Sequence, residues 1–229
     1  MSKKTIIVIP AYNEEQTIGQ LIERCKKKAD ICVVNDGSKD KTFEIVNSYP
    51  DVIQITHKKN AHIPQTIKDG MMYAYVNDYD YIITMDAGLS HLPEELSYFI
   101  DYPDCDLLVG YRTQKVNVPW YRQLLSIIGT LSINMVIRPP FSKLTHQWFK
   151  DITSGYRRYS KKAIEILLNR KMMSRTFDFH SEAFMLIYRN GLSIKEIPIT
   201  YVFTNSSLRF KVILDSIRML FNMFISRRK

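Results

Sequence analysis

Short apolar runs alternate with amphipathic segments through the first 85 residues of the chain. The apolar runs cover residues 5–10, 31–34, 52–56 and 81–85, and the segments 13–29, 42–48 and 65–77 between them are predicted helices. Asn13 is the expected N-cap of the first helix, because acidic residues follow it and basic residues end the segment. Strands that are apolar throughout and alternate with helices are typical of a mostly parallel sheet covered on both faces. The pattern therefore predicts an α/β fold.

Polar segments follow three of these predicted strands directly where each strand ends. Their sequences are PAYNEE at residues 10–15, NDGSKD at 35–40 and DAGLSH at 86–91. Any one of them is compatible with ordinary turn chemistry. Ligands of parallel α/β sheets bind beyond the carboxyl ends of the strands, so three polar segments at successive strand ends indicate a binding site.

The last part of the chain has a different character and is predicted to be a separate amphipathic helix. Between residues 208 and 225 apolar positions recur at helical spacing, and residues 205–229 contain six basic residues and one acid. A wide apolar face with a basic tail is typical of a helix in a membrane interface. Docking on the chain's own domain, on an integral-membrane partner or in a homo-oligomer stays open. Residues 119–137 are a second amphipathic candidate.

The composition limits the remaining choices. With 229 residues, 45% of them hydrophobic, the chain is long enough for one catalytic-sized domain, residues 1–204, with the helix 205–229 as an appendage. The net charge of +9 predicts attraction to nucleic acid, an anionic membrane or phosphorylated substrates. No base-reading module is recognisable, so nucleic acid is not an expected partner.

Cysteine usage and hydropathy point to a cytoplasmic protein at a membrane surface. The three cysteines have no metal-ligand spacing, and we expect them to be small buried hydrophobes in a reducing compartment. No apolar run approaches the roughly 20 residues of a membrane-spanning helix. The expected location is therefore cytoplasmic and peripheral to the cytoplasmic membrane.

Several motifs resemble family 2 glycosyltransferases of the GT-A fold. The segments, which occur in that family's order and approximate spacing, are VIPAYNEEQTI, VVNDGSKDKT, MDAGLSHLPEEL, LLVGYR, DITSGYRRYS and FDFHSEAFMLIYRNGLSIKEIPITY. The chain is most similar to the dolichyl-phosphate mannose synthase branch and its bacterial polyprenyl-phosphate relatives, from about residue 5 to residue 203. The resemblance implies inverting transfer of a hexose from a UDP- or GDP-sugar to a polyprenyl phosphate, for glycan assembly.

The resemblance also implies roles for individual residues on the donor side. It places the nucleotide against Pro10, Tyr12, Glu14, Val34 and Asp36, and the ribose and diphosphate along Asp86, Ala87 and Gly88, with Arg112 nearby. Carboxylates accept hydrogen bonds from base and sugar groups, and an aromatic ring can pack on a base.

On the acceptor side, the resemblance assigns the lipid phosphate to Arg112, Arg122 and Ser126. Guanidinium groups bind phosphate bidentately, and residues four apart on a helix face the same way. A phosphate monoester is largely ionised at neutral pH, so no general base is required. Asp151, Thr153, Ser154 and Gly155 are expected near the donor sugar. For Glu182, orientation of an arginine and a buried salt bridge both stay open.

The chain departs from the family pattern at the position of the metal. Gly88 replaces the usual second acid, so Mg²⁺ or Mn²⁺ would keep Asp86, substrate oxygens and water. His91 is either an additional Mn²⁺ ligand or, as we favour, a histidine at the entry of a helix. Three other departures have separate consequences. Asn35 replaces an acid, which removes a charge but keeps an acceptor, and Ala61, His62 and Pro64 replace the family's glycines, which puts donor specificity in doubt. The basic function of the segment after residue 200 would move to Arg209 or Lys211.

Three functional hypotheses follow from this departure. We favour an enzyme in which basic side chains neutralise the leaving diphosphate. A non-catalytic nucleotide-sugar or lipid-phosphate binding scaffold is the alternative from another class. Transfer to a sugar hydroxyl would need a general base, and none is recognisable.

Overall fold

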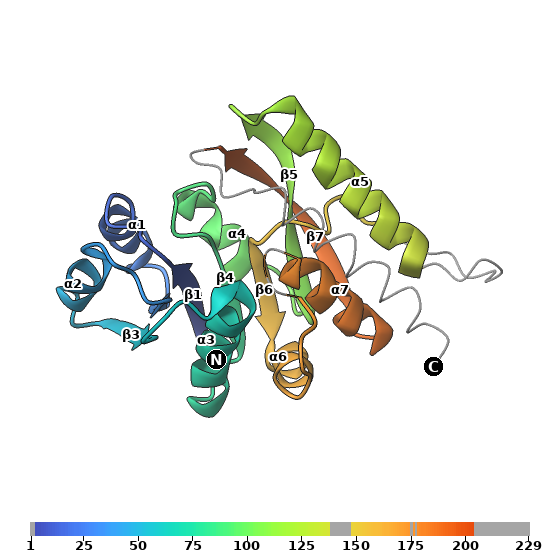
Figure 1. The fold of residues 1–229 in the computed structure, drawn as a ribbon. Coiled ribbons are helices and arrows are strands. Elements are labelled where there is room, and N and C mark those ends of the chain that lie inside the picture. The colour runs from blue at the N-terminus through green and yellow to red at the C-terminus, as the bar shows by residue number, and fades with distance from the viewer. Residues whose placement is uncertain (1–2, 138–147, 175, 177, 204–229) are drawn as a thin grey trace.

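The computed structural model describes residues 3–137, 148–174, 176 and 178–203 of the chain. The described strands form one sheet with the order β3-β2-β1-β4-β6-β5-β7 (Figure 1). β6 is antiparallel to both of its neighbours, and the other pairs are parallel. The strands are β1 (Thr5–Ala11), β2 (Asp30–Asn35), β3 (Val52–Thr56), β4 (Tyr81–Thr84), β5 (Leu107–Val116), β6 (Arg157–Ser160) and β7 (Ile194–Val202).

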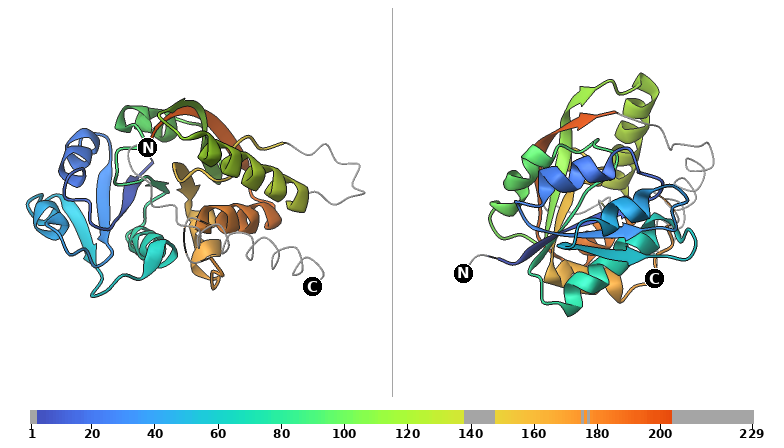
Figure 2. Two further views of the ribbon diagram at one scale, coloured as in Figure 1. Left: turned by 45° about the horizontal axis from the view of Figure 1, so that its top comes forward. Right: turned by 90° about the vertical axis from the view of Figure 1, so that its left-hand side faces the viewer.

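Helices cover both faces of this sheet, as the apolar strands predicted (Figure 2). The face that carries Ile6 and Val8 of β1 packs against α3, α6 and α7, and the face that carries Ile7 and Ile9 packs against α1 and α4. The helical elements are α1 (Ile18–Cys25), α2 (Thr42–Asn47), α3 (His62–Val76), the 3₁₀ turn η1 (Pro93–Glu95), α4 (Leu96–Ile100), α5 (Trp120–Ile137), α6 (Lys161–Leu168) and α7 (Phe179–Arg189). The predicted α/β architecture with a mostly parallel sheet is confirmed.

The first helix begins later than predicted, and Asn13 is not its N-cap. Asn13 has a positive φ of 56°, and Thr17 is the residue that precedes α1. The Asn13 side chain instead accepts a hydrogen bond from the backbone N–H of Lys39 at 2.8 Å. The prediction was wrong because this amide caps a turn at the end of the neighbouring strand, a contact that local sequence does not announce.

The cysteines behave as expected, and the two amphipathic segments differ in what the structure describes. Cys25, Cys32 and Cys105 are free and buried, and burial raises the pKa of both Cys25 and Cys32 to about 12. The segment 119–137 forms α5, whereas the predicted helix 205–229 lies outside the described residues. Within the described part of the chain, none of the helices combines the length and the hydropathy needed to cross a bilayer.

Candidate functional site: a pocket at the strand ends and an arginine cluster

The polar ends of β1 and β2 bond directly to each other. The backbone N–H of Asn13 donates to Ser38 Oγ at 3.0 Å, and that of Glu14 donates to Thr42 Oγ1 at 2.8 Å. β4, which precedes Asp86, pairs with the other side of β1. The sheet therefore brings the three polar segments to one edge, as predicted from their positions after successive strands.

A pocket of about 520 Å³ opens at the ends of β2 and β3. Two of its lining residues are aromatic and have exposed side chains, Tyr12 at 44% and Phe43 at 43%. Such rings can pack against a nucleobase. The lining residues are Tyr12, Asn35, Gly37, Ser38, Lys39, Phe43, Thr56, His57, Lys58, Lys59 and Asn60. Of the residues expected at the nucleotide, Tyr12 lines this pocket, whereas Pro10 and Val34 are register partners in β1 and β2.

Asp36 lies between two residues that line the pocket, Asn35 and Gly37, and both of its carboxylate oxygens are engaged. They accept hydrogen bonds from the backbone N–H groups of Ala61, at 2.7 Å, and His62, at 3.0 Å. Oδ1 also lies 2.6 Å from His57 Nδ1, and the other ring nitrogen lies 2.9 Å from Asp69 Oδ2. Asp36 therefore holds the segment that forms one pocket wall. His57, which sequence reasoning missed, joins β3 to β2 and α3.

Glu14, two residues after Tyr12 of the pocket, lies within electrostatic range of Asp86 in the segment after β4. Burial raises the pKa of its carboxyl group, a hydrogen bond from Thr17 opposes that shift, and the nearby charges of Asp86 and Asp40 add to it. Asp86 itself keeps 36% of its side chain exposed. Ala87 and Gly88 form the turn that follows. A partly exposed carboxylate thus lies at the same edge of the sheet as the pocket.

His91 packs against Asp86 in a way that defines its tautomer. Its Nδ1 accepts the backbone N–H of Asp86 at 3.1 Å, so in the neutral ring the hydrogen is on Nε2, which lies 3.7 Å from Asp86 Oδ2. Burial lowers the pKa of His91, against the opposing charge of Asp86. In this tautomer Nε2 has no free lone pair for a cation. The geometry favours the helix-entry interpretation of His91 over a Mn²⁺ ligand.

Within the described residues, no group of three or more His, Cys, Asp or Glu side chains is arranged to hold a metal ion. The exposed carboxylate of Asp86 fits a more limited role, in which a cation is held mainly by substrate phosphates and water. This arrangement agrees with the glycine at position 88.

His180 is a second residue at this site that the sequence did not single out. It is 4% exposed on α7, and a Cβ on Gly155 would lie 2.9 Å from its Nε2 and 3.5 Å from Asp86 Oδ1. Burial, Arg157, His91 and Arg112 together lower its pKa well below the usual value, so the ring is neutral. Its Nδ1 has no hydrogen-bond partner among the described residues. The one available signal was its place two residues before Glu182 in a motif of the resemblance.

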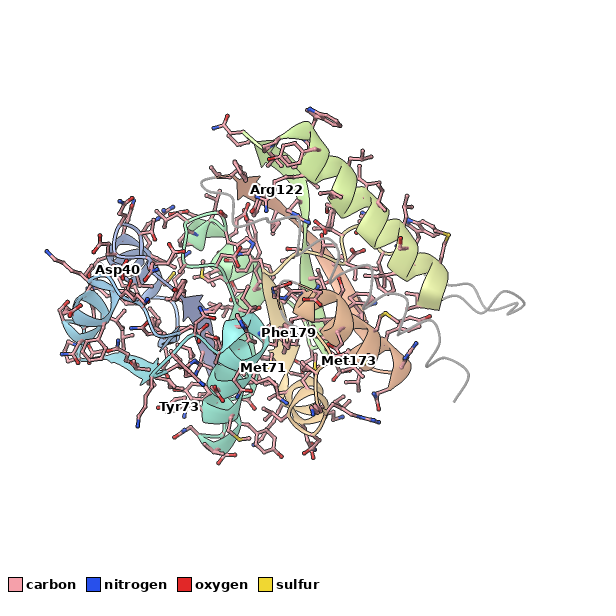
Figure 3. The ribbon with its side chains drawn as sticks, in the orientation of Figure 1. Asp40, Met71, Tyr73, Arg122, Met173 and Phe179 are labelled. Atoms are coloured by element: carbon pink, nitrogen blue, oxygen red, sulfur yellow. The ribbon has the colours of Figure 1, made fainter. Side chains whose placement is uncertain are left out.

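Glu182 holds a turn. Its carboxylate accepts hydrogen bonds from the backbone N–H groups of Met173, at 2.8 and 3.1 Å, and Ser174, at 2.7 Å. This contact ties residues 173 and 174 to α7, which carries Glu182 (Figure 3, where Met173 and Phe179 are labelled).

Arg112 of β5 lies at the centre of a compact cluster. Its Nε donates to Asp151 Oδ2 at 2.6 Å, and its Nη2 donates to Asp151 Oδ1 at 2.9 Å, to Ser126 Oγ at 2.8 Å and to Thr153 Oγ1 at 2.5 Å. Burial alone would lower the pKa of the guanidinium and raise that of the carboxyl group, but their mutual attraction reverses both shifts. Both groups are therefore charged, and the guanidinium is held in one orientation.

Arg122 lies near this cluster but outside its hydrogen bonds. It is labelled in Figure 3 and sits one helical turn before Ser126 on α5. Its guanidinium carbon lies 5.0 Å from the ring centroid of Phe203. Arg112 lies in the same manner 5.3 Å from Tyr201. Two guanidinium groups thus border the end of β7, one fixed by a carboxylate and one packed on an aromatic ring.

Comparison with known proteins decides the family. Residues 6–168 match the model of glycosyl transferase family 2, which is more than half of the chain. The chain belongs to glycosyl transferase family 2. This glycosyltransferase has the GT-A fold of its structural neighbours. One of these is the structure of glucosyl-3-phosphoglycerate synthase from Mycobacterium tuberculosis in complex with Mn²⁺, UDP and phosphoglyceric acid, to which the chain is similar with a TM-score of 0.70. At 13% identity over 98% of this chain and 78% of that one, the likeness concerns the fold alone.

Sequence relatives are closer than these structures. The polyprenol monophosphomannose synthase of Mycolicibacterium smegmatis is 31% identical, over 87% of this chain and 78% of its own length. The UDP-N-acetylglucosamine–dolichyl-phosphate N-acetylglucosaminyltransferase of Methanococcus voltae is 27% identical, with 91% and 90% covered. The undecaprenyl-phosphate mannosyltransferase of Micrococcus luteus is 28% identical, with 87% and 84% covered.

Proposed function

We propose that this family 2 glycosyltransferase moves a hexose, with inversion, from a UDP- or GDP-sugar to a polyprenyl phosphate at the cytoplasmic face of a membrane. The observation that carries the proposal is the Arg112 guanidinium, which Asp151 holds in a bidentate pair beside two hydroxyl groups. The named relatives from Mycolicibacterium and Micrococcus, a polyprenol monophosphomannose synthase and an undecaprenyl-phosphate mannosyltransferase, support a lipid-phosphate acceptor.

On the donor side, the nucleobase would pack against Tyr12 in the pocket, and the diphosphate would extend toward Asp86. A Mg²⁺ or Mn²⁺ ion at Asp86 would supply positive charge to the leaving diphosphate, with Arg112 and the neighbouring basic residues as the other sources. The solved structures of glucosyl-3-phosphoglycerate synthase with Mn²⁺ and UDP-glucose are consistent with such an ion.

On the acceptor side, Arg112, Arg122 and Ser126 would hold the lipid phosphate. Arg112 Nη1 has no hydrogen-bond partner among the described residues, so its two hydrogens are available to a ligand. A phosphate oxygen attacks the anomeric carbon, and the bond from that carbon to the nucleotide diphosphate breaks. The attacking phosphate is already ionised, so the transfer needs no base.

The exposed surface of α5 supports a membrane location for this site. Its outer side chains are apolar and solvent-accessible, and Figure 1 shows the helix running along the outside of the molecule. They are Trp120, Leu124, Ile127, Ile128, Leu131 and Met135. Because Ser126 lies on the same helix, an acceptor phosphate bound there would leave its prenyl chain beside this apolar surface.

The test is release of nucleotide diphosphate from a panel of UDP- and GDP-sugars, with and without polyprenyl phosphate in detergent, in Mg²⁺, Mn²⁺ or EDTA. We expect release that requires the lipid phosphate and is strongly reduced in Arg122→Ala. Transfer that is unchanged in this variant would contradict the acceptor assignment. Binding of a nucleotide-sugar without release under any condition would support the non-catalytic scaffold instead.

A further inference from the structure

Two neighbouring arginines of β6 are buried completely, which is unusual for charged side chains. Arg157 is 0% exposed and Arg158 is 1% exposed. Successive residues of a strand face opposite sides of the sheet, so the two guanidinium groups lie in different layers. Among the described residues, no carboxylate forms a salt bridge with either one. Backbone carbonyl oxygens provide most of their hydrogen bonds.

Arg157 clamps the loop that carries Asp151 and Thr153. Its Nε donates to the carbonyl of Ser154 at 2.7 Å, and its Nη2 donates to the carbonyl of Ile152 at 2.5 Å. Its Nη1 donates to the carbonyl of His180 at 2.6 Å, which ties the same loop to α7. Burying a charge is costly unless it is hydrogen-bonded, so the guanidinium favours the loop conformation that brings the carbonyls of Ile152 and Ser154 to it.

The loop that Arg157 holds through its carbonyls contacts Arg112 through its side chains. The side chains of Asp151 and Thr153 bond to Arg112, whereas the carbonyls of the residues that alternate with them, 152 and 154, bond to Arg157. Thr153 also bonds to Ser126 of α5 at 2.9 Å. The same loop therefore bonds to the buried Arg157 through its carbonyls and to Arg112, the arginine expected to hold the acceptor phosphate, through its side chains.

We propose that Arg157 is a positioning residue of the acceptor site: through the loop 151–155 it sets where Asp151 and Thr153 hold Arg112. The inference rests on the proposed function for its kinetic consequence, but its structural part concerns the loop alone. Arg157 is fully buried, and all three nitrogens of its guanidinium group donate to backbone carbonyls. It therefore acts through Arg112 and not on the substrate.

Arg158 is a matched control next to it in the chain. Its Nη1 donates to the carbonyls of Phe99, at 2.8 Å, and Tyr102, at 2.7 Å, and its Nη2 donates to that of Pro103 at 2.7 Å. Its guanidinium carbon lies 4.1 Å from the ring centroid of Tyr81. These contacts concern the turn after α4, on the opposite face from α7, so Arg158 has the same chemistry without the connection to Arg112.

The experiment compares Arg157→Lys with Arg158→Lys. Lysine keeps the charge but cannot place a planar fork on three carbonyls. We expect both variants to lose thermal stability. In Arg157→Lys alone, we expect kcat/KM for polyprenyl phosphate to fall by about tenfold to a hundredfold, the range for a displaced site group, while KM for the nucleotide-sugar stays within about twofold. Hydrogen–deuterium exchange should increase at the amides of residues 151–156 in this variant only.

Equal kinetic losses in the two variants, or unchanged exchange at residues 151–156 in Arg157→Lys, would overturn the inference. If the wild-type protein transfers no sugar to polyprenyl phosphate, the proposed function fails. The exchange comparison, together with calorimetric binding of a short-chain prenyl phosphate to both variants, still decides whether Arg157 positions the loop. Loop protection that is lost only in Arg157→Lys, with weaker prenyl phosphate binding, would support the inference.

Discussion

Replacing Asp151 by asparagine should destabilise the protein and weaken the acceptor site together. The substitution keeps the shape of the side chain but removes its charge and turns one acceptor into a donor that faces Arg112. The side chains of Arg112 and Asp151 are only 16% and 8% exposed, so solvent does not compensate for the lost partner. Breaking a buried ion pair by removing one partner costs about 3–5 kcal/mol, and we expect the lower value because asparagine retains one acceptor.

A loss of about 3 kcal/mol corresponds to a decrease in melting temperature of about 6 to 12 °C for a protein of this size. The measurement is thermal unfolding followed by circular dichroism or calorimetry. The control is Glu23→Gln, which removes an exposed pair with Lys26 in which the two side chains are 50% and 43% exposed and should leave the melting temperature unchanged. A melting temperature of Asp151→Asn within about 2 °C of the wild type would refute the importance of the pair.

The same variant has a pH signature. Arg112 outweighs burial and holds the pKa of Asp151 below its usual value of 3.8, so the pair stabilises the folded state above that value. The contribution is lost as the pH falls through the lower, folded-state pKa. The wild-type melting temperature should therefore fall more steeply than that of Asp151→Asn as the pH falls below 3.8. Parallel curves for the two proteins would contradict the assignment.

Three further substitutions test other parts of the site. Gly155→Ala should lower the transfer rate and the free energy of unfolding, the latter by about 1–3 kcal/mol, because its Cβ would lie 2.9 Å from the buried His180 ring. Wild-type values in both the unfolding and the rate measurement would contradict this. His57→Ala should raise KM for the nucleotide-sugar by about tenfold, because the pocket wall loses the contacts of this ring with the carboxylates of Asp36 and Asp69, while KM for the lipid stays constant. Asp86→Asn should abolish any stimulation of transfer by added Mn²⁺, and a metal titration with the wild-type profile would show that the ion binds elsewhere.

Local patterns were sufficient to predict the first half of the sheet. The apolar runs at residues 5–10, 31–34, 52–56 and 81–85 correspond to β1 through β4 within a residue or two. For β1, β2 and β4 the reason is burial on both faces, which requires a strand to be apolar throughout, whereas β3 is an edge strand and only partly buried. The same argument placed the polar segments at one edge. It failed at Asn13, whose side chain bonds to Lys39 across the strand ends, and it did not predict that α1 begins only at Ile18.

The cluster around Arg112 was predictable in two of its members, but the contacts between its residues were not. The motif resemblance singled out Arg112 and Ser126, and the structure joins them through a hydrogen bond of 2.8 Å. Asp151, 39 residues further along the chain, was expected near the donor sugar and proved to be the partner that orients Arg112. Arg122, assigned to the same phosphate, packs on Phe203 instead of bonding within the cluster.

The sequence by itself determined the alternation of strands and helices, the edge of the sheet where the polar segments meet, and the family. Those properties depend on apolar periodicity and on short motifs, which act over a few residues. Only the tertiary structure decided that Asp36 supports a wall, that His57 bridges two carboxylates and that Arg157 clamps the loop behind Arg112. The physical reason is that a buried polar group must find partners wherever the packed chain supplies them, and those partners come from distant segments that no local pattern identifies.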